Sequence, residues 1–277
     1  MVEAPRIRII TEKVKFTENM IIINASGASY KKIGINLVGY TIKKWWFAGK
    51  YIYTYLTRDD FIPYVIRTHT MMYGKIIVNN DPVVNPKLNA YLLLELNDKT
   101  ILTWYLTQIK ILDPTCELDL VKSNYAMCSS KKSIDESMTM MKYDISNPFY
   151  DKKIHWKHLL IGAKNHGEDI ITDFLLDQKY FPGVGNILQQ EALYRCKIIP
   201  TKKLSEMTNN NFKCLVGELD SIIKALYQSY KRKIENKPHI PIFQIYHKKF
   251  CPLGHKTKTK YLGYHNRRTT WCPICQT

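Results

Sequence analysis

The chain contains no long apolar run. None of its segments approaches the ~20 consecutive apolar residues that a membrane-spanning helix requires. The first residues include Glu3 and lack the apolar segment of a secretory signal peptide. We therefore expect a protein that is neither inserted in a membrane nor secreted, and that works inside the cell.

Carboxylates are scarce relative to basic side chains. The 277 residues include 24 Asp and Glu against 41 Lys and Arg, which gives a formal net charge of +17 and a pI near 9.4. An excess of this size favours a polyanionic partner, above all a nucleic acid. A basic surface that only confers solubility is the alternative. Apolar residues make up 45% of the chain, enough for real hydrophobic cores, and the length allows two domains.

Cysteine is sparse and unevenly placed. The chain has seven cysteines, an odd number, and three of them lie within the last 27 residues. Without a secretion signal, such clustering indicates metal ligands rather than disulfides. The remaining four are expected to be unrelated reduced thiols: Cys116, Cys128, Cys196 and Cys214.

Two close pairs of soft ligands stand near the C-terminus, in the pattern Cys251-x3-His255-x16-Cys272-x2-Cys275. This spacing, with a hairpin-sized loop between the pairs, is typical of a closed tetrahedral Zn²⁺ site. Because no coordination position is open, we expect a structural zinc, without which so short a module cannot hold a core. Basic and aromatic residues alternate between the pairs, which suits contact with phosphates and unstacked bases. The other nearby histidines, His247 and His265, are interpreted as surface or nucleic-acid-facing residues.

Segments rich in Ile, Val, Tyr and Thr, separated by turn signals, predict β-strands between residues 20 and 112. The expected strands are 20–25, 33–40, 51–56, 64–78, 90–96 and 101–112. Many short strands with regular turns indicate a β-sandwich or barrel. Pro5 and apolar residues at helical spacing predict a leading helix between Val2 and Phe16.

From Trp156 the apolar spacing becomes helical. The expected helices are 155–164, 168–178, one that follows Asn186, and 210–233. The patterns together predict an α+β fold: an N-terminal β-sandwich with a leading helix, then a helical domain that ends in a zinc-finger β-hairpin. The expected boundaries are an N-terminal β-sandwich domain at 1–142, a hinge at 143–155, a nucleic-acid-binding helical domain at 156–247 and the zinc finger at 248–277.

A glycine-rich turn, Pro182-Gly183-Val184-Gly185-Asn186, precedes the third of these helices. Two glycines permit a sharp turn, and Asn186 is expected to cap the helix. Unpaired N–H groups and the positive end of the helix dipole favour an anion in front of the turn. On so basic a chain the expected anion is a nucleic-acid phosphate, and a plain helix start is the alternative.

Four stretches, in this order, resemble the Fpg/Nei family of DNA glycosylases. They are Val2-Glu3-Ala4-Pro5; Gly49-Lys50-Tyr51 with His69-Thr70-Met71-Met72-Tyr73-Gly74; Leu176-Asp177-Gln178 through the glycine turn to Glu191-Ala192-Leu193; and Phe243-Gln244-Ile245-Tyr246 with Asn266-Arg267-Arg268-Thr269-Thr270-Trp271-Cys272. The third is similar to the family's helix–two-turn–helix, and the fourth to its zinc-finger entry and hairpin. The resemblance spans nearly the whole chain and implies a base-excision-repair DNA glycosylase that is also an AP lyase.

The resemblance also implies roles for single residues. Its catalytic residues would be Val2, Glu3 and Lys50, and its DNA-binding residues Asn186, Arg267, His69 and Met72. An α-amine has a pKa near ~8 against ~10.4 for lysine, so the Val2 amine, freed by removal of Met1, suits nucleophilic attack at pH 7. Glu3 would be the general acid. Plainer alternatives are a helix N-terminal carboxylate for Glu3, a solvated lysine for Lys50, and buried strand residues for His69 and Met72.

The sequence departs from the family pattern at three places. The family's N-terminal residue is usually proline, whereas Val2 is similar to the third vertebrate Nei-like glycosylase, on whose branch we expect this chain. Arg6 stands where the family has a second acidic residue. The family's arginine–phenylalanine loop, which fills the gap left by a flipped base, has no clear counterpart in Leu102–Leu112. Loss of that wedge favours single-stranded or open DNA.

The sequence therefore predicts a monomeric, zinc-containing enzyme that acts on damaged or abasic DNA, in the nucleus or another site of genome replication. The branch implies oxidised pyrimidines and hydantoins as substrates. A proline iminium stays cationic, whereas a valine imine can lose its proton and then withdraws electrons from the sugar less strongly. Strand cleavage should therefore be slower than base removal, and β-elimination products should outnumber β,δ-elimination products. The rival hypotheses are a non-catalytic protein that binds damaged or single-stranded nucleic acid, and an RNA-binding protein, since helix–two-turn–helix folds also occur on the ribosome.

Overall fold

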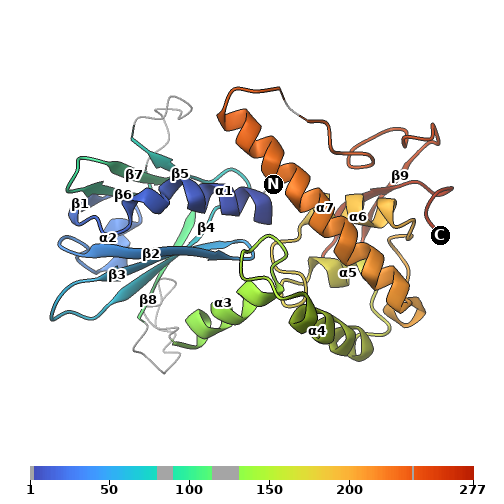
Figure 1. The fold of residues 1–277 in the computed structure, drawn as a ribbon, viewed down its shortest axis with the longest axis horizontal. Coiled ribbons are helices and arrows are strands. Elements are labelled where there is room, and N and C mark those ends of the chain that lie inside the picture. The colour runs from blue at the N-terminus through green and yellow to red at the C-terminus, as the bar shows by residue number, and fades with distance from the viewer. Residues whose placement is uncertain (1–2, 80–89, 114–130, 239) are drawn as a thin grey trace. The chain divides into compact units, whose positions relative to one another are not determined.

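The computed structural model describes residues 3–79, 90–113, 131–238 and 240–277 (Figure 1). These residues form two compact units. The first unit holds Ile7–Thr139, and the second holds Met140–Thr277 together with Glu3–Arg6 from the beginning of the chain. In the part of the chain that is described, no helix is long and apolar enough to cross a membrane.

The first unit is built from two antiparallel four-stranded sheets, with strand orders β1-β6-β7-β5 and β2-β3-β4-β8 (Figure 1, blue to green). The strands are β1 (Ile22–Ser26), β2 (Thr41–Ala48), β3 (Tyr51–Thr57), β4 (Tyr64–His69), β5 (Lys75–Val78), β6 (Leu92–Leu96), β7 (Ile101–Tyr105) and β8 (Gln108–Leu112). The helical segments of this part of the chain are α1 (Ala4–Val14), η1 (Lys15–Thr17), α2 (Tyr30–Ile33) and α3 (Lys131–Tyr143).

The core of the first unit contains side chains from both sheets. Ile52 of β3 and Leu94 of β6 are fully buried, as are the residues two positions away on each strand, because side chains on one face of a strand recur every second residue. Trp45 of one sheet stacks on Trp104 of the other, with ring centroids 6.2 Å apart. Both indole N–H groups donate hydrogen bonds to buried threonine hydroxyls at 3.0 Å. These contacts confirm the predicted N-terminal β-sandwich.

The segments 64–78 and 101–112, each predicted as one strand, form two strands each, with breaks at residues 70–74 and 106–107. One further predicted strand is absent, and one observed strand was not predicted. Residues 33–40 form no strand, because Gly34 and Gly39 adopt φ values of 72° and 86° that interrupt extended backbone. The unpredicted strand is β2. Its period-two pattern is broken by the Lys43–Lys44 pair, and its pairing with β3 shifts register between Ile42 and Lys44.

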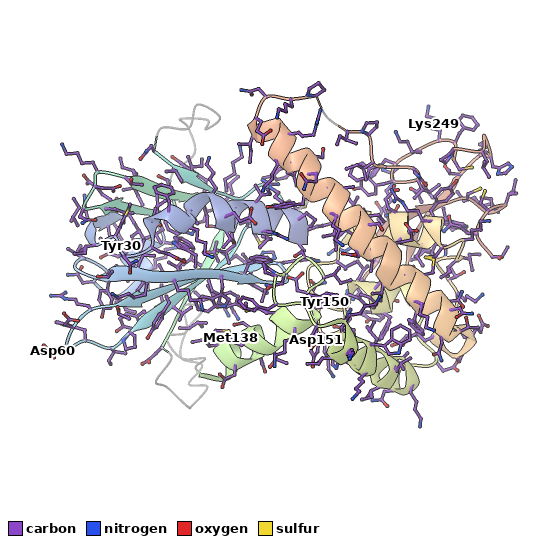
Figure 2. The ribbon with its side chains drawn as sticks, viewed as in Figure 1. Tyr30, Asp60, Met138, Tyr150, Asp151 and Lys249 are labelled. Carbon is purple, nitrogen blue, oxygen red and sulfur yellow. A yellow bond between two sulfur atoms is a disulfide. The ribbon has the colours of Figure 1, made fainter. Side chains whose placement is uncertain are left out.

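The second unit is helical and ends in a hairpin. Its helices are α4 (Lys152–Asn165), α5 (Ile171–Leu176), α6 (Asn186–Arg195), η2 (Leu204–Glu206) and α7 (Asn209–Ile234), and its strands are β9 (Lys258–Leu262) and β10 (Arg267–Trp271). Asp151, labelled in Figure 2, caps α4 by accepting the N–H groups of Lys153 and Ile154. The arrangement confirms the predicted helical domain with a terminal hairpin.

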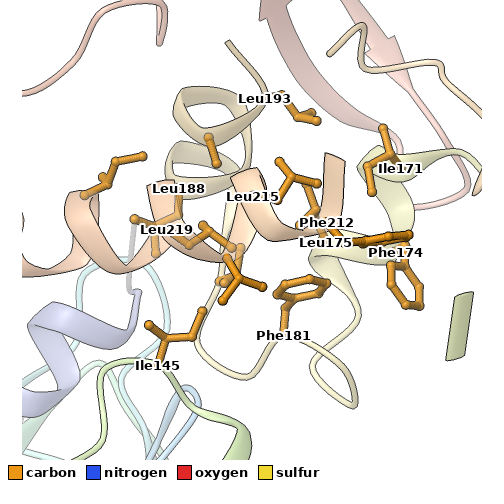
Figure 3. Close-up of a cluster of buried hydrophobic side chains, with 14 of the residues drawn as sticks. Ile145, Ile171, Phe174, Leu175, Phe181, Leu188, Leu193, Phe212, Leu215 and Leu219 are labelled. Atoms are coloured by element: carbon orange, nitrogen blue, oxygen red, sulfur yellow. The ribbon is translucent and has the colours of Figure 1, made fainter. Parts of the chain in front are cut away.

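The core of the second unit lies among α5, α6 and α7 (Figure 3). Along α7, buried apolar side chains recur every three or four residues, as in Phe212, Leu215 and Leu219. Leu188 of α6 and Phe174 of α5 belong to the same cluster. The long helix α7, orange in Figure 1, therefore serves as the apolar support for the shorter helices.

A disulfide joins the end of α6 to α7. Cys196 and Cys214 are bonded, with Cα atoms 5.8 Å apart. The expectation that they are unrelated reduced thiols is wrong, because the packing of α6 on α7 brings together two residues whose spacing gave no sign of pairing. Cys116 and Cys128, the other two thiols of that expectation, lie outside the described residues.

Helix α6 buries polar side chains as well as apolar ones. Glu191 is fully buried, and its carboxylate accepts three backbone N–H groups from the segment that leads to the hairpin. The donors are Gln244 at 2.8 Å, Ile245 at 3.0 Å and Tyr246 at 2.8 Å. This segment belongs to no helix or strand, so the carboxylate supplies partners that secondary structure does not.

We expect Glu191→Gln to lower the free energy of unfolding by about 2 kcal/mol or more, since it replaces charge-assisted hydrogen bonds and brings an amide N–H₂ against backbone donors. Urea titration measures the change. The matched control is Asp220→Asn, which breaks an exposed ion pair with Lys224 and should cost less than about 1 kcal/mol. Equal losses in the two variants would contradict the role given to Glu191.

Candidate DNA-processing site

The four predicted metal ligands come together at the base of the hairpin. The ligand atoms of Cys251, His255, Cys272 and Cys275 all lie within 4.8 Å of one another. Cys251 Sγ is 3.9 Å from Cys275 Sγ, and His255 Nδ1 is 3.7 Å from Cys251 Sγ. Tetrahedral zinc with Zn–S bonds of about 2.3 Å requires sulfur atoms about 3.8 Å apart, so this donor set can hold the ion.

The neighbouring histidines do not take part in this cluster. His247 and His265 are both exposed and stand outside the ligand group, as expected. Their exclusion leaves a donor set of three sulfurs and one nitrogen, in which every member is a protein side chain. The metal would therefore have a structural role.

The other end of the chain reaches the glycine turn. The Ala4 N–H donates to the Gly183 carbonyl at 3.0 Å, and the Ile187 N–H donates to Glu3 Oε1 at 2.8 Å. Glu3 is only 4% exposed. A Cβ on Gly185 would collide with the Glu3 carboxylate, so any other residue at this position would displace the Glu3 side chain. The turn thus binds an anion, and in this structure the anion is a side chain of the protein itself.

One expectation about this turn needs correction. Asn186 does not cap the helix: Gly185 is the N-cap, and Asn186 is the first residue of α6. The acceptor at this helix start is Glu3, whose carboxylate accepts the Ile187 N–H. A carboxylate there combines a charge-assisted hydrogen bond with the helix dipole, and is a stronger acceptor than an asparagine amide.

Asn186 instead holds the hairpin. Its Nδ2 donates to the Arg268 carbonyl at 2.9 Å, and Gln190 Nε2 donates to the same oxygen at 3.0 Å. Gln190 Oε1 also accepts the Thr270 N–H at 2.9 Å. Helix α6 therefore fixes the backbone of β10, while the side chains of Arg267 and Arg268 remain exposed.

A second anchor holds the hairpin turn. Asp173 of α5 is buried, and its carboxylate accepts the N–H groups of Tyr264 at 3.1 Å and His265 at 3.3 Å. Gly263, at φ 68°, lies so close to Asp173 that a side chain would strike the carboxylate. Neither Asp173 nor Gln190 was expected to serve the site, because their partners are backbone groups that leave no pattern in the sequence.

The remaining expected site residues lie in the first unit. Lys50 is in the turn that joins β2 to β3, His69 ends β4, and Met72 is in the loop between β4 and β5. Met72 is exposed, so its alternative interpretation as a core residue is wrong. Burial, and then the charges of Lys50 and Arg67, hold the pKa of His69 below its ordinary value. In neutral His69, Nδ1 accepts the Met71 N–H at 3.2 Å. The ring proton therefore lies on Nε2, which can donate a hydrogen bond.

Strands β7 and β8 are joined by only two residues, Leu106 and Thr107. The sequence led us to expect no arginine–phenylalanine loop here, and a connection of two residues is too short to form one. Arg6 lies in the first turn of α1, on the short segment that belongs to the second unit. Val2 lies outside the described residues.

Comparison with known proteins identifies the helical part of this site. Residues 150–236 match the formamidopyrimidine-DNA glycosylase H2TH domain family. This range contains α4 to α7 and the glycine turn that Glu3 caps. The second unit therefore contains a helix–two-turn–helix domain of the DNA glycosylase class.

Comparison over the whole chain extends this result. Endonuclease 8-like L720 from Acanthamoeba polyphaga mimivirus is 51% identical over 276 residues, which cover 100% of both chains. A crystal structure of a viral DNA glycosylase matches with a TM-score of 0.92 at 50% identity, again over 100% of both chains. The chain belongs to the Fpg/Nei family of DNA glycosylases.

More distant proteins are similar in fold or in part. A Lactococcus lactis Fpg in complex with THF-DNA and an inhibitor has a TM-score of 0.73 at 18% identity, covering 99% of both chains. Endonuclease 8-like 3 from Bos taurus is 25% identical over 229 residues, which are 82% of this chain and 33% of that protein. The chain thus spans about a third of that vertebrate relative.

We expect His255→Ala to lose the bound metal and His265→Ala to retain it, because only the first lies in the ligand cluster. Zinc released from denatured protein is measured with a colorimetric chelator and should be about one ion per chain in the native protein and in His265→Ala. Equal zinc content in the two variants would refute the ligand set.

We expect Asp173→Asn to loosen the hairpin turn without changing zinc content, since the amide N–H₂ opposes the backbone donors of Tyr264 and His265. Hydrogen–deuterium exchange across residues 258–271 should become faster. Asp177→Asn removes the same charge just beyond α5 and is the control, for which exchange in the hairpin should be unchanged. Unchanged exchange in both variants would rule out the anchor.

Proposed function

We propose that the protein is a bifunctional DNA glycosylase and AP lyase of base-excision repair, with damaged or abasic DNA as its substrate. The observation that carries the proposal is the Glu3 carboxylate, buried and bonded to the start of the helix–two-turn–helix glycine turn through Ile187. Covalent geometry alone keeps the Val2 amine within one residue of that carboxylate. A fixed acid beside an α-amine is the combination that Schiff-base chemistry on a sugar needs.

In the proposed reaction, the lone pair of the Val2 amine attacks C1′ of the damaged nucleotide. The glycosidic bond breaks, and its electrons leave with the base. The Val2 nitrogen, positively charged after the attack, gives one proton to the Glu3 carboxylate, and the departing base takes its proton from water. Glu3 then passes its proton to the ring oxygen as the bond between C1′ and that oxygen breaks, so that the sugar opens and the nitrogen–carbon bond becomes a protonated imine. Glu3 can later return protons during elimination, because its hydrogen bond to Ile187 prevents the carboxylate from moving away.

The valine amine sets the balance of the lyase step. Proline, a secondary amine, gives an iminium that stays cationic, whereas the primary amine of Val2 gives an imine that can lose its proton. The neutral imine withdraws electrons less from the sugar. We therefore propose that strand cleavage is slower than base removal, and that β-elimination products outnumber β,δ-elimination products.

The remaining residues are proposed to hold DNA. Asn186 fixes the Arg268 carbonyl, and the exposed Arg267 beside it contacts a phosphate next to the lesion. Lys50 and the neutral His69 are proposed to contact phosphates from the first unit. The Lactococcus lactis complex with THF-DNA supports DNA as the partner.

Substrate choice is proposed from the short β7–β8 connection and the similarity to Endonuclease 8-like 3. Without a wedge to displace the opposite strand, single-stranded or open DNA is the favoured form. We propose oxidised pyrimidines and hydantoins as the bases removed, a monomer as the active form, one structural zinc, and action at a site of genome replication.

Borohydride trapping on a single-stranded oligonucleotide with one abasic site tests the proposal. Protein with a processed N-terminus is compared with protein in which a retained Met1 blocks the Val2 amine, and with Lys50→Ala. We expect a covalent adduct for the processed protein and for Lys50→Ala, none for the blocked protein, and mainly β-elimination products on the same gel.

The other outcomes are equally decisive. If the blocked protein still forms an adduct, and the Lys50→Ala variant of the blocked protein forms none, then the nucleophile is Lys50. DNA binding without any adduct would identify a non-catalytic DNA-binding protein. Tighter binding to RNA than to damaged DNA, measured in competition, would favour the RNA-binding alternative.

A further inference from the structure

One side chain holds both sides of the peptide group that joins Gly183 to Val184 in the glycine turn. Gln178 Nε2 donates to the Val184 carbonyl at 3.0 Å and to the Leu176 carbonyl at 2.8 Å. Gln178 Oε1 accepts the Gly183 N–H at 3.0 Å. Because one end of this amide faces carbonyls and the other faces an N–H group, a flipped amide would lose all three hydrogen bonds. The side chain therefore fixes this part of the turn in one orientation.

The backbone that follows Gln178 is itself held by α4. His158 Nε2 donates to the Lys179 carbonyl at 2.9 Å, and His155 Nε2 donates to the Tyr180 carbonyl at 2.7 Å. His155 is buried. A side chain whose own backbone is fixed can determine the position of its partners, whereas one on a loose segment would move with them. Gln178 is thus a fixed bridge from α4 to the glycine turn.

The turn that Gln178 fixes also holds the beginning of the chain. The Gly183 carbonyl accepts the Ala4 N–H at 3.0 Å, so one residue of the turn binds Gln178 through its N–H and Ala4 through its oxygen. Consecutive Cα atoms are about 3.8 Å apart, which keeps the Val2 Cα within about 8 Å of the Ala4 Cα. A displacement of the Gly183 carbonyl therefore reaches the Val2 amine over only two residues.

We propose that Gln178 is a positioning residue for the Schiff-base step: its amide fixes the Gly183 carbonyl, and that carbonyl, through Ala4, fixes the place of the Val2 amine. Gln178 is not among the groups proposed to contact DNA. An error of about 1 Å in the position of a reacting group can slow a reaction about a hundredfold, so a side chain with this role acts on rate and not on affinity. The inference rests on the proposed function for the identity of the nucleophile.

Two substitutions test this role. Gln178→Met keeps the length of the side chain and removes all three hydrogen bonds. Gln178→Glu keeps an acceptor for the Gly183 N–H but sets a second oxygen against the Leu176 and Val184 carbonyls, so that repulsion displaces the turn. The control is Gln228→Glu, which makes the same chemical change on the exposed side of α7. Zinc content equal to that of the native protein shows that each variant has folded.

Rate and affinity are measured separately. With protein in saturating excess over a single-stranded oligonucleotide that has one abasic site, the borohydride adduct should form about tenfold more slowly, or slower still, in both Gln178 variants. The dissociation constant for the same strand with a tetrahydrofuran residue, which cannot form an imine, should change less than about twofold. Asn186 and Gln190 still hold the Arg268 carbonyl in these variants, which preserves the DNA-facing side of the hairpin. Gln228→Glu should behave as the native protein does in both measurements.

Hydrogen exchange of the Ala4 amide, followed without DNA, should be faster in both Gln178 variants, because its acceptor is no longer fixed. Unchanged exchange would overturn the route through Gly183. Parallel losses of rate and affinity would show that Gln178 supports the DNA-binding fold and would overturn the positioning role. An unchanged adduct rate in both variants would overturn this inference and leave the proposed function intact, whereas the absence of any adduct with the native protein would overturn the proposed function and the positioning role together.

Discussion

Buried backbone N–H and C=O groups must find hydrogen-bond partners, and in the second unit the side chains of one short helix supply many of them. The chain after α7 has little regular structure, so its backbone has few partners of its own. Helix α6 supplies them through Asn186, Gln190 and Glu191, which contact the hairpin strand and the segment before it. Its N-terminus is completed in turn by Glu3. The position of every DNA-facing group that we propose in this unit depends on these bonds.

Much of this could be predicted from local pattern. The zinc ligands have a spacing that few other structures share, and the glycine turn with its helix is recognisable from Gly183 and Gly185 alone. Period-two and period-three-to-four patterns located most strands, the leading helix and helices α4 to α7, because burial of one face imposes those periods. The pattern misled where glycines interrupted an apolar segment, at residues 33–40, and where adjacent lysines interrupted a strand, at β2. It also missed α3 and the breaks that divide 64–78 and 101–112 into two strands each.

What sequence could not supply is the identity of non-local partners. Glu3 and Ile187 are 184 positions apart, and no pattern in either segment predicts the hydrogen bond between them. Asn186 is a good capping residue by type, yet a carboxylate from the other end of the chain outcompetes it. Cys196 and Cys214 carry no mark that separates a bonded pair from two free thiols. The sequence did contain one sign of these contacts. Helix α6 has no polar face, yet it contains the polar run Gln189-Gln190-Glu191, whose side chains need partners once they are buried.

The bonds of α6 have a consequence for how the protein is made. Its partners include Glu3, which is translated long before α6, and Thr270, which is translated long after it. The buried carboxylate and amides of α6 must therefore stay hydrated until β10 has left the ribosome, because contacts this distant in sequence form only after both segments are present. The second unit is completed as a ring of contacts that begins at Glu3 and ends at β10. A nascent chain that has not yet reached β10 lacks the partners of Asn186 and Gln190.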